Sequence, residues 1–376
     1  MDAIQLTSKL ITFKSVTPEE DGIFDYITDL LTSNSFKVEV VTFEEPGFAP
    51  IKNIYAEIGD GAKNLAFAGH LDVVPIGDKA AWTVGPFSGE IKDGKLYGRG
   101  ASDMKSGVAA WICAAIRASK ELKDFKISLL LTGDEESVAI NGTQKLLKWM
   151  EQKGYKMSAC LVGEPTSESV LGDTIKIGRR GSATFEIEAR GVQGHVAYPH
   201  LAKNPVHMLT EAIVALKKIK LDDGTSDFQA SNLECVNIEV GNKAANVIPA
   251  KAKAMVNIRH NTLHSAESLH KLLQDKCAQV DSEISVKRTD SSDAFLTKDL
   301  ALANILSDIV KEVASVEAKL STAGGTSDAR FIQKYCPVAE LGVLNATAHK
   351  VDENVVAEDI ALLSEIYYKL IIRYFI

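Results

Sequence analysis

Cysteine is scarce in this sequence of 376 residues: there are five, and no two of them form a C-x-x-C pair. Scattered cysteines, odd in number, are typical of reduced thiols and argue against a disulfide framework or a thiolate zinc site. Basic residues are also in short supply, because 42 lysines and arginines face 50 acids and leave a net charge of −8. No basic tract offsets this charge, so we expect no nucleic-acid partner.

Long apolar runs are absent as well. No stretch approaches the ~20 apolar residues that span a membrane. The first six residues combine neither the basic segment nor the long apolar segment of a secretory signal. We therefore expect no membrane partner and a cytoplasmic location. The composition itself, 45% hydrophobic and 24% charged, is that of an ordinary globular chain with room for two domains.

Residues 64–75 are the most informative segment of the sequence, and the other candidate residues are interpreted by comparison with it. Their apolar run, residues 65–68, predicts a short buried strand that ends at Gly69. His70 and Asp72 follow directly. Because ligands of an open α/β sheet bind beyond the carboxyl ends of its strands, these two side chains are candidates for a site at that edge.

Three further apolar runs are each followed by acids or a histidine. A single carboxylate after a strand is usually a capping or surface residue. Four strand ends of the same kind, in contrast, suggest one shared metal centre. The three runs and the residues after them are 127–132 with Asp134, Glu135 and Glu136, 159–162 with Glu164, and 338–341 with Asn345 and His349.

Asp103 is a further candidate, in a glycine-flanked loop before an apolar helix predicted from Val108 to Ala118. Its structural alternative is an N-cap or first-turn carboxylate. Imidazole and carboxylate ligands without thiolate suit a catalytic zinc site. Two histidines with three or more carboxylates are too many for one ion. We therefore expect two metal ions, ~3.5–4 Å apart as in two-metal hydrolases, with Asp103 as the bridge.

Glu135 and Glu136 are adjacent, so their side chains point in different directions in any regular backbone. One could bind a metal while the other moves a proton to and from water, and the pattern leaves open which does which. Asp72, two residues after His70, is interpreted as the partner that orients the His70 imidazole.

Strands alternate with helical patterns up to about residue 178, which predicts an α/β fold with a mostly parallel, doubly wound sheet. From residue 179 the predicted order becomes β-α-β-β-α-β, the split βαβ arrangement. We therefore predict the first part of a metal-binding domain at residues 1–178 and its second part at residues 294–376. An inserted α+β, ferredoxin-like domain occupies residues 179–293.

The motifs around the candidate ligands resemble the signatures of the M20 family of dinuclear zinc aminoacylases and peptidases. These motifs are residues 69–75 (GHLDVVP), 98–105 (GRGASDMK) and 134–136 (DEE). The resemblance covers essentially the whole chain. Other segments narrow it to the amidohydrolases of this family that act in diaminopimelate and lysine biosynthesis, namely residues 178–182, 191–200, 246–249, 324–328, 340–342 and 345–350.

The resemblance implies hydrolysis of the amide of N-succinyl-LL-2,6-diaminoheptanedioate by a water that two Zn²⁺ ions activate, with Co²⁺ as a possible replacement. It implies that Glu135 is the general base and acid, and that Asp72 stands behind His70. The implied metal ligands are His70 and Glu164 for one zinc, Glu136 and His349 for the other, and Asp103 between the two.

The resemblance also implies roles for residues of the inserted domain. His195, otherwise a turn or surface residue, would donate to the oxyanion in the active site of the partner in a homodimer. Arg179 and Arg259 would bind substrate carboxylates, although an arginine is more often a surface residue. The segment 324–326 is predicted to open a helix whose N–H groups hold a further carboxylate. The other candidates for substrate binding are Ser182, Tyr198, Asn246, Gly325, Thr326 and Asn345.

Two alternatives remain open from the sequence. The first is a sister enzyme with the same metals and another substrate, such as an acetylornithine deacetylase or an M20 peptidase. The second is a non-catalytic metal- or amino-acid-binding protein on the same fold. A carboxylate left free beside a metal ligand, as one of Glu135 and Glu136 would be, argues against the second.

Overall fold

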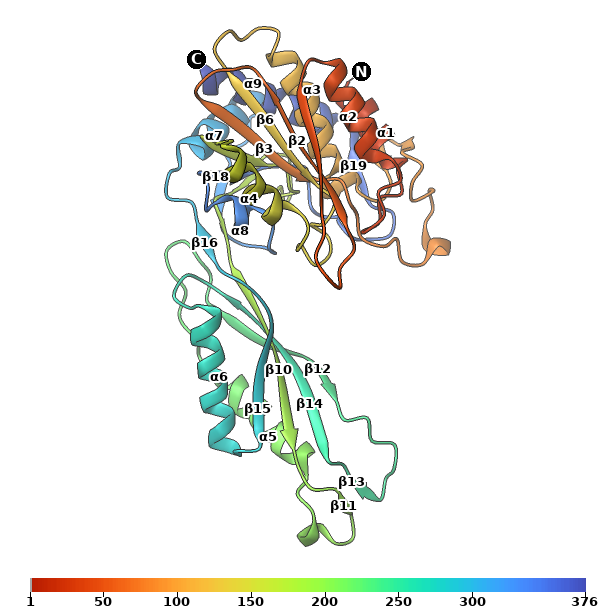
Figure 1. The fold of residues 1–376 in the computed structure, drawn as a ribbon, viewed down its shortest axis with the longest axis vertical. Coiled ribbons are helices and arrows are strands. Elements are labelled where there is room, and N and C mark those ends of the chain that lie inside the picture. The colour runs from red at the N-terminus through yellow and green to blue at the C-terminus, as the bar shows by residue number, and fades with distance from the viewer. Residues whose placement is uncertain (1) are drawn as a thin grey trace. The chain divides into compact units, whose positions relative to one another are not determined.

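The computed structural model describes residues 2–376, which form two compact units (Figure 1). The large unit contains the chain up to Ile177 together with Thr297–Ser321 and Ser327–Ile376. The small unit contains Gly178–Leu296 and the short segment Thr322–Thr326.

The segment Thr322–Thr326 departs from the predicted division, which gave the whole C-terminal part of the chain to the first domain. Its hydrogen bonds explain the difference. Arg179 Nη1 donates to the carbonyl of Gly325 over 3.1 Å, and the Thr322 hydroxyl donates to the carbonyl of Asp227. The segment groups with the small unit because residues of that unit satisfy its polar groups.

The large unit is built on an eight-stranded sheet with the strand order β1-β2-β6-β3-β7-β18-β8-β17. β3 is parallel to both β6 and β7, β7 is parallel to β18, and only the β1–β2, β2–β6 and β18–β8 pairs are antiparallel. The strands are β1 (Lys37–Phe43), β2 (Ile51–Ile58), β3 (Asn64–His70), β6 (Lys126–Thr132), β7 (Ala159–Val162), β8 (Thr174–Lys176), β17 (Lys319–Ser321) and β18 (Val338–Glu340), with β4 (Ile91–Lys92), β5 (Lys95–Tyr97) and β19 (Asn354–Val356) in a separate small sheet.

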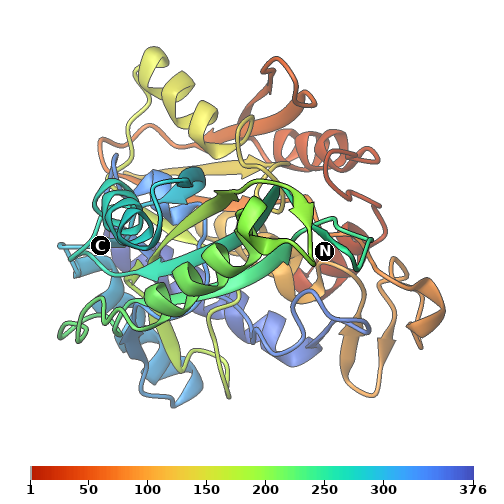
Figure 2. The ribbon, with the colours of Figure 1, turned by 90° about the horizontal axis from the view of Figure 1, so that it is seen from below.

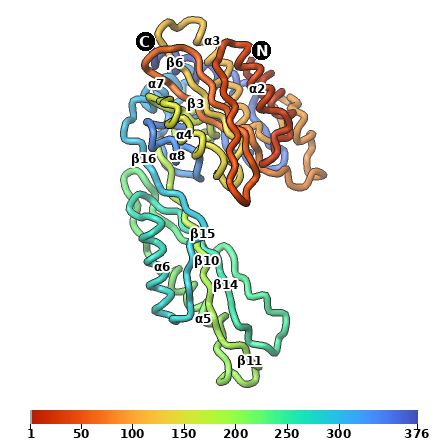
Figure 3. The backbone as a smooth tube through the Cα atoms, in the orientation of Figure 1, coloured from red at the N-terminus to blue at the C-terminus, as the bar shows by residue number. Residues whose placement is uncertain are grey.

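Helices cover both faces of this sheet, and Figure 2 shows α4 and α9 on opposite sides of the strands. On one face α3 packs against α1 and α9, and α9 also contacts α7; on the other, α4 packs against β2, β6 and α8. Both ends of the described chain lie in this unit, where α1 contacts α9 (Figure 3). The helices are α1 (Ala3–Ile11), α2 (Ile23–Ser33), α3 (Ser106–Ala118), α4 (Thr143–Lys153), α7 (Ala301–Ala314), α8 (Ala329–Ile332) and α9 (Ala357–Phe375).

Three aromatic side chains anchor β3 in the core. The ring of Phe67 in β3 stacks on Trp111 of α3 with centroids 4.9 Å apart, and Tyr367 of α9 meets both rings edge-on. All three side chains are fully buried. Each aromatic pair contributes about 0.5–1.5 kcal/mol beyond its buried area. This packing fixes the strand whose carboxyl end carries the first candidate ligand.

β3 runs through His70, whereas the sequence pattern predicted its end at Gly69. The reason is the neighbouring strand: β3 stays in parallel register with β6 as far as the pair His70 and Thr132. His70 is therefore held by the sheet itself. This placement is more rigid than a loop position would be.

The small unit has a four-stranded antiparallel sheet with the order β12-β14-β10-β15, and α5 and α6 pack against this sheet and against each other. Along the chain the order is β10-α5-β12-β14-α6-β15, as the sequence predicts. The elements are β10 (Gly181–Arg190), α5 (Pro205–Lys217), β12 (Asn232–Glu239), β14 (Lys251–His260), α6 (Ala266–Val280) and β15 (Ile284–Ser292).

Two short strand pairs flank this sheet. β11 (Gly194–His195) pairs with β13 (Val247–Ile248), and β9 (Gly178–Arg179) pairs with β16 (Phe295–Leu296). The predicted α/β class with a mostly parallel central sheet is thus confirmed. Within residues 2–376, no helix has the length and apolar character needed to cross a membrane.

Candidate metal centre

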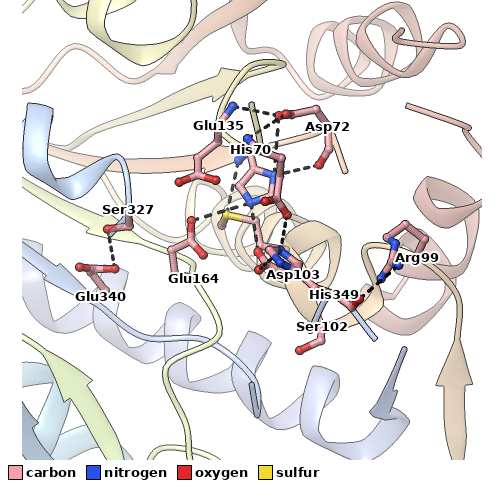
Figure 4. Close-up of polar contacts among 12 residues, drawn as sticks. His70, Asp72, Arg99, Ser102, Asp103, Glu135, Glu164, Ser327, Glu340 and His349 are labelled. Carbon is pink, nitrogen blue, oxygen red and sulfur yellow. Dashed lines mark hydrogen bonds and ion pairs between the residues drawn. The ribbon is translucent and has the colours of Figure 1, made fainter. Parts of the chain in front are cut away.

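Asp103 lies between two histidines that come from distant parts of the chain (Figure 4). Its Oδ1 is 3.1 Å from Nε2 of His70, and its Oδ2 is 3.3 Å from Nε2 of His349 in the loop between β18 and β19. Each carboxylate oxygen therefore faces one imidazole. A carboxylate with one oxygen toward each of two ligand sets has the geometry of a bridge between two cations.

The loop before α3 gives Asp103 this position. Gly100 adopts a left-handed conformation with φ +88°, and a Cβ there would lie 2.8 Å from the Val73 side chain. Asp103 itself has extended backbone angles (φ −124°, ψ 100°), and α3 begins only at Ser106. The N-cap of α3 is Lys105, so the capping alternative for Asp103 is wrong.

Two further predicted ligands complete the cluster. Oε1 of Glu136, in the loop after β6, is 2.9 Å from Nε2 of His349. Oε1 of Glu164, just after β7, is 3.8 Å from Nε2 of His70. The structure thus brings together all five residues predicted as metal ligands, with a histidine and a glutamate on each side of Asp103.

The contacts of His70 favour positive charge in this cluster. Nδ1 lies 2.9 Å from the backbone carbonyl of Asp72, and because a carbonyl only accepts, Nδ1 carries the hydrogen. Nε2 faces the Asp103 carboxylate at 3.1 Å, a contact that requires positive charge, either a proton on the ring or a bound cation. Burial opposes a charge on His70, but the contacts with Asp103, Glu164 and Asp72 outweigh it and raise the pKa of His70 well above its ordinary value. Nitrogen and oxygen donors without thiolate suit Zn²⁺ or a similar divalent ion.

The other side of the cluster also favours positive charge. Contacts with Asp103 and Glu136 raise the pKa of His349 to about 10. The residues present therefore fit a pair of divalent cations. His70 and Glu164 would hold one ion, Glu136 and His349 the other, with Asp103 shared.

Glu135 lies beside this cluster. One of its carboxylate oxygens is within 4.8 Å of ligand atoms of His70 and Glu164, and Figure 4 shows its side chain on their side of the site. Burial raises the pKa of Glu135 well above its ordinary value. A carboxyl group of raised pKa, close to a metal centre, is suited to take and return a proton near neutral pH.

Asp72 contacts more of the site than the sequence analysis anticipated. Its carboxylate is 3.7 Å from His70 Nδ1, and the two oxygens accept the backbone N–H groups of Glu135 and Glu136 over 3.3 and 3.1 Å. The hydroxyl of Thr17 donates to the same carboxylate over 2.5 Å. Asp72 therefore connects the histidine to the turn that carries both glutamates. No sequence pattern pointed to Thr17, which is 55 residues away.

Two buried side chains near the centre were also not singled out. Arg99 belongs to the GRGASDMK motif and Glu353 follows His349 by four residues, but neither was assigned a role. They form an ion pair with Nη1 and Oε2 2.7 Å apart. Two sequence signals could have pointed to this pair. Arg99 lies inside a motif that carries a candidate ligand, and Glu353 is an acid shortly after another candidate ligand.

The predicted substrate-binding residues of the small unit fall into two groups. The first gathers where β10 begins: Ser182 is in register with Arg259 of β14, and Arg179 of β9 contacts Gly325. Burial and the neighbouring guanidinium of Arg180 lower the pKa of Arg259, so positive charge is concentrated here. Such a group of cations is suited to bind carboxylates.

The second group lies past the other end of β10. Nδ1 of His195 accepts the N–H of Ala197 over 3.0 Å, and the rings of His195 and Tyr198 are 5.6 Å apart. The backbone carbonyl of Asn246 accepts the N–H of Val196 over 3.1 Å. The Tyr198 side chain is 56% exposed. Ten residues of extended strand, about 30 Å, separate this group from the arginines.

The segment 324–326 does not open a helix. The next helix, α8, begins at Ala329 and has four residues, and Gly325 uses its carbonyl to accept from Arg179. The predicted helix N-terminus that would hold a carboxylate at Gly325 and Thr326 is therefore wrong. Asn345 lies in the large unit, in the loop after β18, and its N–H donates to the carbonyl of Ser167 over 3.0 Å.

Comparison with known proteins agrees with this fold and site. Residues 66–373 match the peptidase family M20/M25/M40. This chain belongs to that family, and the predicted resemblance is confirmed.

Full-length relatives narrow the comparison. Succinyl-diaminopimelate desuccinylase of Rhodospirillum centenum is 49% identical over 377 residues, which cover 100% of this chain and 97% of the relative. The desuccinylase of Ehrlichia canis is 45% identical over 376 residues, covering 100% and 99%.

Solved structures support the fold. The M20 family metallo-carboxypeptidase Sso-CP2 from Sulfolobus solfataricus superposes with a TM-score of 0.81 at 17% identity, covering 99% of each chain. The YXEP protein of Bacillus subtilis, described as a dinuclear metal binding peptidase of the M20 family, gives a TM-score of 0.74 at 15% identity, covering 99% of this chain and 97% of its own.

Proposed function

We propose that this protein hydrolyses N-succinyl-LL-2,6-diaminoheptanedioate to succinate and LL-2,6-diaminoheptanedioate in diaminopimelate and lysine biosynthesis. The observation that carries the proposal is Asp103, which offers one oxygen to each of two histidines beside Glu135. That arrangement supports metal-assisted amide hydrolysis. The choice of substrate is supported by relatives of 49% and 45% identity over the whole chain, both named succinyl-diaminopimelate desuccinylase.

We assign two Zn²⁺ ions to the five-ligand cluster, and Co²⁺ would accept the same donors. In such a site the metal pair lowers the pKa of water toward ~7 and polarises the carbonyl that is attacked. Asp103 sets the spacing of the two positions because its oxygens face opposite histidines. Asp72 keeps His70 in the tautomer that presents Nε2 to the metal, through the contact of its carbonyl with Nδ1.

Glu135 carries the proton through the reaction. Its carboxylate removes a proton from the attacking water, and its raised pKa allows it to hold that proton. It then gives the proton to the amide nitrogen as the C–N bond breaks, so that the amine can leave. The Asp72 carboxylate keeps Glu135 and Glu136 in place by accepting both of their backbone N–H groups.

Arg179 and Arg259 are assigned to substrate carboxylates. The substrate has three carboxylates and one ammonium, and a chain of net charge −8 needs fixed cations to bind it. The group of cations where β10 begins supports this assignment, with Ser182 in the same place. We assign a supporting contact to Asn345. Tyr198 and Asn246 belong to the distant group of His195, so they would contact the substrate from the partner in a homodimer.

We further propose a homodimer in which His195 donates to the oxyanion in the active site of the partner. The separation of about 30 Å along β10 supports this, because His195 and the arginines of one chain cannot meet at one small substrate. The edge strand β12 exposes Val236 and Ile238, each 57% exposed, and an apolar edge favours pairing between chains. The five free thiols accord with a reducing, cytoplasmic location.

A substrate panel tests the proposed function. Zinc-loaded protein should release succinate from N-succinyl-LL-2,6-diaminoheptanedioate with a kcat/KM at least about 100-fold above that for N-acetylornithine or for dipeptides. A difference of this size follows when fixed arginines bind carboxylates that the analogue lacks. Rapid cleavage of acetylornithine without turnover of the succinylated substrate would contradict the proposal.

A further inference from the structure

Arg99 and Glu353 form a buried ion pair next to the candidate metal centre. Their side chains are 2% and 0% exposed, and Arg99 Nη1 lies 2.7 Å from Glu353 Oε2. A buried pair of this kind is weak support for stability, because apolar residues of similar volume often serve as well. What the two side chains contact is therefore more informative than their burial.

Glu353 holds the loop that presents Asp103. Its second oxygen, Oε1, accepts the backbone N–H of Ser102 over 2.9 Å and that of Asp103 itself over 3.0 Å. These two N–H groups lie in the irregular segment before α3, so strand or helix hydrogen bonds do not fix them. Glu353 thus fixes the backbone position of Asp103, the residue whose carboxylate is the proposed bridge.

Arg99 holds the loop that presents His349. Its guanidinium donates to the carbonyl of Lys350 over 3.1 Å and, at the limit of hydrogen bonding, to that of His349 over 3.5 Å. It also donates to the carbonyl of Pro75 over 3.2 Å, in the segment that follows His70. His349 has φ +64°, a left-handed conformation that a non-glycine residue keeps only when its surroundings enforce it. Figure 4 shows Arg99 beside His349.

We propose that Arg99 and Glu353 are positioning residues that hold Asp103 and His349 at the spacing needed to bind the metal ion between them. These hydrogen bonds join Arg99 and Glu353 to each other and to the segments that carry His70, Asp103 and His349. The proposal rests on the proposed metal centre. Beyond that centre, it states that Arg99 and Glu353, which do not bind metal themselves, determine the affinity of one metal position. That position is formed by Asp103, His349 and Glu136.

Two substitutions test this proposal. Glu353→Gln keeps the shape, but its amide cannot accept from Arg99 and from both backbone N–H groups at once. Arg99→Lys keeps the charge, but an ammonium lacks the planar fork that reaches several carbonyls. In chelator-buffered zinc titrations, we expect each variant to bind one metal about 10- to 100-fold more weakly, the usual effect of losing a group that orients a ligand. The affinity for the other metal ion should change much less. Cobalt-loaded variants should also show a visible absorption spectrum that differs from that of the wild type.

Asp222→Asn is the matched control. Asp222 also accepts backbone N–H groups, those of Gly224 and Ser231, but it lies in the small unit and contacts no candidate ligand. This variant should lose stability while its metal affinities stay at the wild-type values.

The outcomes separate the two proposals. Unchanged affinities in folded Glu353→Gln or Arg99→Lys protein would overturn the role of the pair, as would an equal loss in Asp222→Asn. If Glu353→Gln does not fold, Arg99→Lys decides alone, and if neither folds while Asp222→Asn does, the pair is structural and the proposal is wrong. Wild-type protein that binds fewer than two metals would instead overturn the metal centre itself.

Discussion

Replacing Glu135 by glutamine should lower the turnover of N-succinyl-LL-2,6-diaminoheptanedioate by about 10²–10⁴-fold, the usual contribution of a general acid–base group. Glutamine has nearly the same shape but cannot take a proton from water or return one to the leaving nitrogen. Because Glu135 is not among the five proposed ligands, both metals should stay bound. Steady-state kinetics at saturating substrate, together with metal analysis of the same sample, measure the two effects.

Glu312→Gln is the control for this substitution. Glu312 is on the surface of α7, where it pairs with Lys369 and Arg373. Its loss should leave both turnover and metal content unchanged. A Glu135→Gln variant that keeps wild-type turnover, or that loses a metal, would contradict the division of roles between Glu135 and Glu136.

Replacing Asp103 by asparagine should have the second large effect. An amide offers one neutral oxygen, so it cannot serve both the His70 side and the His349 side of the cluster. We expect the protein to retain at most one metal at free zinc concentrations that fill both positions of the wild type. Turnover should fall by about 10³-fold or more, since the metal pair supplies several kcal/mol of charge stabilisation in the transition state.

Equilibrium dialysis against buffered zinc, followed by elemental analysis, measures the metal content of Asp103→Asn. Asp78→Asn is its control, because Asp78 is an exposed carboxylate whose side chain accepts the nearby N–H of Ala80. Two metals retained by Asp103→Asn at wild-type affinity would show that Asp103 is not the bridge.

The residues at strand ends could be predicted because parallel strands bring their carboxyl ends to one edge. His70 is the last residue of β3, Glu164 follows β7, and the pair Glu135 and Glu136 follows β6. The apolar runs of these strands were therefore enough to place the four residues together. His349 was reached the same way from β18. For these positions, backbone topology decides which side chains meet, and topology can be inferred from periodicity.

Contacts made by side chains from distant segments could not be predicted in this way. Thr17 donates to Asp72 across 55 residues, and Arg99 pairs with Glu353 across 254. Nothing in the hydrophobic pattern encodes such partners, because a buried polar residue can be satisfied by any segment that packs nearby. These residues contact the segments that carry the proposed ligands, so the sequence pattern indicated the proposed metal ligands but not the side chains that we propose hold them in place.

Two predictions were wrong because they relied on the local preference of glycine alone. Two adjacent glycines at 324 and 325 suggested a helix start, but α8 begins four residues later and is only one turn long. Gly69 suggested a strand end, but pairing with β6 carries β3 one residue further. In both cases tertiary contacts, an arginine in the first and a neighbouring strand in the second, overrode the local preference.

Anomalous diffraction at the zinc absorption edge, from crystals of the zinc-loaded protein, tests the central claim most directly. We expect two anomalous peaks per chain, ~3.5–4 Å apart, on either side of the Asp103 carboxylate. One should lie next to His70 and Glu164, and the other next to Glu136 and His349. A single peak, or peaks away from Asp103, would contradict the dinuclear centre and with it the proposed mechanism.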